Sequence, residues 1–159
     1  MSELRPPAVH ASYDAWMASA LALAGEAGAA GDVPVGAVVV DAAGEVIGQG
    51  RNRRTADGDP LAHAEVVALR DAAESRGGWR LDDCTLVVTL EPCPMCAGAA
   101  LQARIERIVL GAWDAKAGAC GSVWDVAREQ RAPHWIEVVG GIRGQECAAL
   151  LTDFFRERR

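Results

Sequence analysis

The sequence predicts an α/β fold, a three-layer α/β/α sandwich in which helices cover both faces of a mixed five-stranded sheet. The chain has 159 residues and is 50% hydrophobic, which is enough to bury one sizeable core. Short apolar runs typical of strands alternate with helical segments, and this alternation is typical of layered α/β folds. No segment is repeated. We therefore expect a single domain over residues 1–159.

The first part of the chain predicts a helix followed by a β-hairpin. Residues 12–30 carry apolar side chains on one face at helical spacing, and Ser12 is placed to cap the helix. Residues 35–40 form an apolar run typical of a buried strand. A turn at residues 41–44 joins it to a second strand at residues 46–50.

Two further helices are predicted from the spacing of apolar residues. After a polar loop over residues 51–59, one helix runs to Gly77 and Gly78, because glycine commonly ends a helix. The other helix closes the chain. The apolar positions are Ala62, Val66, Leu69 and Ala73 in the first of these helices, and Cys147, Leu150, Leu151, Phe154 and Phe155 in the second.

The remaining strands predict parallel pairing. A strand at residues 85–90, a short helix over residues 94–104 and a strand at residues 107–111 make one βαβ unit. Residues 112–135 separate this unit from a last strand at residues 136–140. A parallel crossover needs a dozen or more residues, so the segment is long enough for one.

Charge and cysteine content limit the possible functions. The net charge of −6 has the wrong sign for coating nucleic acid by bulk electrostatics, so any RNA partner must be held locally. No apolar stretch reaches the ~18 residues of a membrane span, and residues 1–10 do not resemble a secretion signal, so we expect a cytoplasmic protein. Cys93 and Cys96 are too close in the sequence for a disulfide bond between them to stabilise the fold, so we expect the cysteines to be reduced thiols or metal ligands.

Four residues form a pattern with a clear chemical meaning. His63, Cys93 and Cys96 offer one imidazole and two thiolates, the ligands that zinc prefers, and leave a fourth position for water. Glu65 lies two residues beyond His63, where it can act as the proton shuttle. The alternative is a structural zinc site, which would leave Glu65 without a role. Its fourth ligand would be Cys84, Cys120 or Cys147.

The H-x-E and P-C-x-x-C pair is the signature of zinc nucleobase deaminases. Further motifs make nearly the whole chain resemble the bacterial tRNA adenosine deaminases. These motifs are VPVGAV (33–38), GxNR (50–53), DPxAHAE (59–65), TLEPCxMCAGA (89–99), DAKxGAxGS (114–122) and ECAALLxDFFRxRR (146–159). The resemblance implies a cytidine-deaminase-like sandwich, a homodimer, one zinc ion per subunit, and conversion of the wobble adenosine of an arginine tRNA anticodon to inosine.

The resemblance also implies residues that bind the substrate. Asn52 matches a residue that hydrogen-bonds the flipped nucleoside, and Asp114 matches one that touches the neighbouring nucleotide. The last helix supplies four candidates for binding the anticodon stem-loop: Phe154, Phe155, Arg156 and Arg159. Taken without the resemblance, Asn52 could form an Asx turn, Asp114 could be a solvated loop carboxylate, and one of the two phenylalanines could belong to the core.

Two other functions fit part of the pattern. A deaminase of a free nucleobase or nucleoside, such as guanine or cytidine, would use the same zinc chemistry. A zinc-stabilised RNA-binding module would need no proton shuttle, so Glu65 disfavours it. The chain also departs from the family pattern within otherwise matching motifs, at Arg54, Leu61, Pro94, Trp113 and Cys120.

Overall fold

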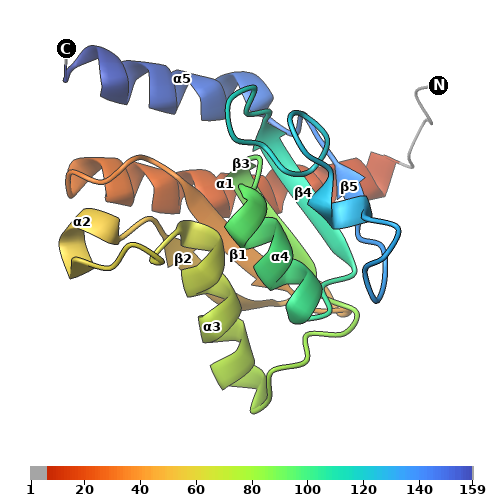
Figure 1. Ribbon diagram of the computed structural model, residues 1–159. Helices are drawn as coiled ribbons and strands as arrows, with labels where there is room; N and C mark the ends of the chain where they lie inside the picture. Colours follow the sequence, from red (N-terminus) through yellow and green to blue (C-terminus); the bar gives the residue numbers. More distant parts are fainter. Residues whose placement is uncertain (1–6, 159) are drawn as a thin grey trace.

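The computed structural model describes residues 7–158, and a mixed sheet of five strands lies at its centre (Figure 1). The strands are β1 (Gly36–Val40), β2 (Val46–Arg51), β3 (Thr85–Leu90), β4 (Arg107–Ala112) and β5 (Glu137–Val139), in the spatial order β2-β1-β3-β4-β5. β1 runs antiparallel to β2 and β3, whereas β3, β4 and β5 are parallel to one another. The predicted mixed sheet and the parallel final crossover are confirmed.

Helices cover both faces of this sheet, which confirms the predicted three layers (Figure 1). Helices α1 (Pro7–Ala29) and α5 (Gly144–Arg156) pack on one face, and α3 (Ala64–Arg76) and α4 (Pro94–Gln102) on the other. Successive side chains of β1 point to opposite faces. Val38 therefore joins the core under α1, with Met17, and Val39 joins the core under α3. Within residues 7–158 no helix is long and apolar enough to cross a membrane.

Two local predictions were wrong. Helix α1 begins at Pro7, so Ser12 lies inside the helix and does not cap it. Proline has the φ angle of a first helical turn, which lets the helix start earlier than the apolar pattern suggests. The predicted polar loop over residues 51–59 contains a short helix, α2 (Arg54–Asp57). The carboxylate of Asp32 accepts hydrogen bonds from the backbone N–H groups of its first turn, a distant partner that local pattern does not reveal.

Glycines allow α3 to lie against the strand β2 with no side chain between them. A Cβ atom built on Gly48 would lie 2.5 Å from the backbone nitrogen of Ala72, and one on Gly50 would lie 2.5 Å from the carbonyl oxygen of Ala64. Both distances are too short for real atoms, so only glycine fits at these positions. Because the start of α3 carries His63 and Glu65, this close approach sets where both residues stand relative to the sheet.

We predict that Gly48→Ala lowers the free energy of unfolding by about 1–3 kcal/mol, because the added methyl group forces α3 away from β2. Urea unfolding followed by circular dichroism measures this change. The matched control is Gly25→Ala in α1, where an added Cβ meets no atom within 4 Å, and where alanine is expected to raise helix stability by up to ~1 kcal/mol. Equal effects of the two substitutions would contradict the packing argument.

Candidate metal centre and active site

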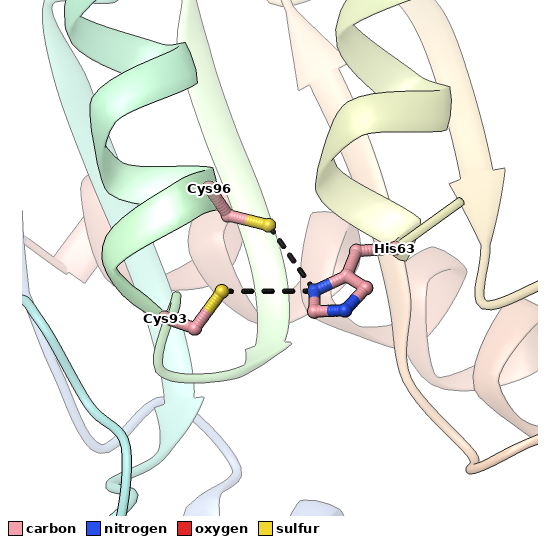
Figure 2. Close-up of side chains that lie close together, drawn as sticks. All are labelled: His63, Cys93 and Cys96. Atoms are coloured by element: carbon pink, nitrogen blue, oxygen red, sulfur yellow. Dashed lines mark hydrogen bonds between the residues drawn. The ribbon is translucent and has the colours of Figure 1, made fainter. Parts of the chain in front are cut away.

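The three predicted zinc ligands come together at the starts of two helices (Figure 2). His63 immediately precedes α3, Cys93 immediately precedes α4, and Cys96 lies in the first turn of α4. The Nδ1 atom of His63 lies 3.6 Å from the Sγ atom of Cys93 and 3.4 Å from that of Cys96. Pro94 occupies the first helical position of α4, where its missing N–H costs nothing.

This spacing fits a single tetrahedral zinc ion. Zn–N bonds of about 2.0–2.1 Å and Zn–S bonds of about 2.3 Å at tetrahedral angles separate nitrogen from sulfur by about 3.6 Å. The two N···S distances match this value. Among the residues that the structure describes, no other histidine, cysteine or carboxylate joins the group, so Cys84, Cys120 and Cys147 do not complete a structural site. Three protein ligands are typical of catalytic zinc.

Hydrogen bonds among the two thiols and the imidazole shift their pKa values in directions that favour metal binding. The hydrogen bond from Cys96 holds the pKa of Cys93 well below its usual range, and His63 lowers it further. The same pairing, together with burial, raises the pKa of Cys96. The hydrogen bond to Cys93 raises the pKa of His63. One thiolate is therefore favoured even before a metal enters, and thiolate is the form that binds zinc.

Glu65 lies beside these ligands in the first turn of α3. Its side chain is 4% exposed, and burial raises its pKa, with a hydrogen bond to Cys96 as a smaller opposing effect. A carboxyl group with a raised pKa accepts a proton more readily than an ordinary carboxylate does, as general acid–base catalysis requires. This environment suits the predicted proton shuttle, which stays a prediction.

A cavity of about 180 Å³ opens onto His63, Glu65 and Cys93. This volume is several times the ~30 Å³ of one water molecule, so the cavity can hold a heterocyclic ring. Asn52 is 8% exposed and lines it. Its Nδ2 atom donates to the carbonyl oxygen of Val33 at 3.3 Å, while its buried Oδ1 atom has no partner. An unpaired buried acceptor costs free energy, which a bound ligand that donates a hydrogen bond would recover.

Asp114 also lines the cavity, and it shapes its own loop as well. Its Oδ1 atom accepts hydrogen bonds from the backbone N–H groups of Lys116 at 3.0 Å and Ala117 at 3.3 Å. The carboxylate of Asp114 therefore stabilises the fold of its own loop, and it also lies where it can contact a ligand in the cavity.

Glu91 also belongs to the site, although the sequence did not predict a role for it. It is 2% exposed and accepts hydrogen bonds from the backbone N–H groups of Asp114 at 2.9 Å, Cys120 at 3.0 Å and Ser122 at 3.1 Å, and from the Ser122 hydroxyl. Burial alone would raise the pKa of Glu91, but these hydrogen bonds lower it. Its position in the sequence could have indicated this role, because an acidic residue directly after a buried strand and two positions before Cys93 lies close to the metal ligands. Glu91 holds the loop over residues 114–122 against the metal-binding segment.

The residues predicted on the last helix do not line the cavity. Phe154 is 9% exposed, and the guanidinium of Arg158 lies 3.5 Å from the centre of its ring. Phe155 is 49% exposed, and together with Arg156 it lines a separate hollow on α5. Arg159 lies outside the described residues. Their predicted contacts with RNA stay predictions.

A histidine and two cysteines grouped around a metal-sized space, with a buried carboxylate at the edge of a mixed sheet, define a zinc-dependent deaminase. Residues 10–112 match the family model of the cytidine and deoxycytidylate deaminase zinc-binding region. The tRNA-specific adenosine deaminase of Haemophilus influenzae is 48% identical over 143 residues, which are 90% of this chain and 83% of that protein. The chain belongs to this zinc-dependent deaminase family and, within it, to the tRNA-specific adenosine deaminases.

Two further similarities concern a longer protein and a solved structure. The tRNA(Ile)-lysidine synthase of Deinococcus radiodurans is 55% identical over 146 residues, which are 90% of this chain and 24% of that protein, so the chain spans about a quarter of its length. A structure from a study of A-to-I editing by tRNA:A34 deaminases at the wobble position of transfer RNA superposes with a TM-score of 0.82 at 41% identity, covering 86% of this chain and 98% of that one. The expected cytidine-deaminase-like fold is confirmed.

We predict that Glu91→Gln loosens the loop over residues 114–122, because an amide group turned toward backbone N–H groups cannot accept all of their hydrogen bonds. Stability should fall by about 1–3 kcal/mol, the cost of unpaired buried polar groups. Hydrogen exchange of the Cys120 and Ser122 amides should accelerate. Glu129→Gln, at an exposed ion pair with Arg131 in another loop, should leave these amides unchanged. Unaltered exchange in Glu91→Gln would contradict the role of Glu91.

Proposed function

We propose that this protein deaminates adenosine to inosine by hydrolysis at the wobble position of a tRNA anticodon. The observation that carries the proposal is the three-ligand metal group beside the buried Glu65 and a ring-sized cavity, in a member of the tRNA-specific adenosine deaminases. Arginine tRNA is the substrate that the motif resemblance names. The proposal treats residues 1–159 as one deaminase domain.

The reaction replaces the 6-amino group of adenine by oxygen, consumes one water molecule and releases ammonia. His63, Cys93 and Cys96 would hold the zinc ion, which would lower the pKa of a bound water molecule from about 15.7 to about 7. Glu65 would accept a proton from the attacking water, donate it to the ring nitrogen next to the amino-bearing carbon, and later help to protonate the departing amine. The raised pKa of Glu65 allows it to hold the proton between these steps.

Asn52 and Asp114 orient the nucleoside during these proton transfers. The free Oδ1 atom of Asn52 accepts a hydrogen bond from it, and Asp114 contacts the nucleotide beside it. An anticodon loop suits this site, because its bases are unpaired and the cost of extruding one into a pocket is small. The stem-loop extends over α5, where the exposed Phe155 and Arg156 contact it, together with Phe154 and Arg159.

The proposal includes a homodimer in the cytoplasm. Four tryptophans are exposed and offer apolar area that a second copy of the chain would cover: Trp79 at 60%, Trp113 at 51%, Trp124 at 50% and Trp135 at 64%. All five cysteines are free, as expected in a reducing compartment.

One assay separates the proposal from a deaminase of free bases or nucleosides. The zinc-loaded protein is incubated with an arginine tRNA anticodon stem-loop and, separately, with adenosine, cytidine and guanine, and the products are identified by mass spectrometry. We expect inosine at the wobble position of the RNA. Turnover of a free compound with unchanged RNA would contradict the proposed substrate.

We predict that Glu65→Gln retains one zinc ion per chain and lowers the turnover of the RNA by about 10²–10⁴-fold, because the amide cannot carry the proton. Zinc content is measured by atomic emission, and turnover by the appearance of inosine. Glu74→Gln, on the exposed side of the same helix, is the matched control and should keep both values. Loss of zinc in Glu65→Gln would show that Glu65 is a metal ligand.

A further inference from the structure

Arg54 stands where two hollows of the surface meet. It lines the cavity that holds His63 and Glu65, and it also lines an adjoining hollow of about 480 Å³. Asn52 and Val33 belong to both linings as well, so the two spaces lie side by side. For a nucleotide whose base entered the cavity, the neighbouring hollow is within reach of an adjoining phosphate.

The charges around the cavity make Arg54 unusual. The cavity is lined by three carboxylates, those of Glu65, Glu91 and Asp114, and the whole chain carries a net charge of −6. Arg54 is the one lysine or arginine in either lining. An RNA backbone approaching this acidic surface is repelled unless a cation meets it at the mouth of the cavity.

The guanidinium of Arg54 is available for such a contact. It is exposed, and it makes no hydrogen bond or ion pair with the side chains that the structure describes, those of residues 11–158. The neighbouring Arg53 differs in this respect, because its guanidinium is bound through two 2.9 Å hydrogen bonds to the carboxylate of Asp57. Arg54 thus leaves its planar set of donors free, and this donor geometry matches phosphate oxygens.

The second hollow offers an environment that an anion can enter. Its one acidic residue, Asp32, is 3% exposed and already accepts hydrogen bonds from the backbone N–H groups of Thr55 and Ala56 at 2.8 and 3.1 Å. The Thr55 hydroxyl forms no hydrogen bond with the described residues and adds a second donor near Arg54. Arginine and threonine side chains are common phosphate ligands in nucleic-acid complexes.

We infer that Arg54, assisted by the Thr55 hydroxyl, binds an RNA phosphodiester group that adjoins the target nucleoside. This subsite rests on the proposed function and extends it, because it distinguishes a nucleotide within RNA from a free base or nucleoside.

The test measures the salt dependence of RNA binding by the full-length, zinc-loaded protein. Fluorescence anisotropy gives the affinity for a labelled anticodon stem-loop between 50 and 200 mM salt for the wild type, Arg54→Ala and Arg54→Lys. Losing one phosphate contact in a single-stranded region should reduce the slope of log K against log salt by about 0.7. Affinity at the lowest salt should fall about tenfold in Arg54→Ala, and Arg54→Lys should keep the slope of the wild type.

Arg76→Ala is the matched control. Arg76 is an exposed arginine at the other end of α3, about 18 Å from the start of that helix, and its removal changes the net charge by the same amount. Its slope and affinity should equal those of the wild type, and all variants should hold the same amount of zinc.

Three results would overturn the inference. An unchanged slope in Arg54→Ala, or an equal fall in Arg76→Ala, would contradict the phosphate subsite while leaving the proposed function intact if the wild type still forms inosine in the RNA. A wild-type protein that neither binds nor converts the stem-loop would contradict the proposed function, and the phosphate subsite with it.

Discussion

The contact between α3 and β2 is the constraint on which the rest of the site depends. Gly48 and Gly50 bring the helix backbone against the strand, and this places the start of α3 at the edge of the sheet where β3 ends. Because α4 follows β3 through a short connection, the first turns of both helices meet at that edge. An imidazole from one and two thiols from the other then come within 4.8 Å of one another.

A second constraint connects the metal ligands to the substrate side of the site. Glu91 follows β3 and is buried beneath the loop that follows β4, whose backbone N–H groups it binds. The parallel pairing of β3 and β4 brings both loops to the same edge. One carboxylate therefore fixes the segment that leads to Cys93 and the segment that carries Asp114. The two halves of the site cannot move independently.

The electrostatic character of the protein explains how an acidic chain can act on a polyanion. The carboxylates of the site interact mainly with the protein itself. Glu65 lies beside the metal ligands, and Glu91 and Asp114 accept hydrogen bonds from the backbone of the loop over residues 114–122. A net charge of −6 excludes general attraction of RNA. Recognition must then rely on a few positions, such as the unpaired Arg54 and the exposed aromatic and basic residues of α5, and on the shape of an extruded base.

Apolar periodicity and ligand spacing are local properties of the chain, and they were enough to predict the strands, the main helices and the ligand set. It did not reveal α2, the start of α1, the role of Glu91 or the burial that separates Phe154 from Phe155. Apart from the start of α1, which the backbone geometry of Pro7 allows, each of these depends on a partner distant in sequence, such as Asp32 beneath α2 or the loop over Glu91. These features arise in the folded molecule, because burial and long-range hydrogen bonds exist only once the layers have packed.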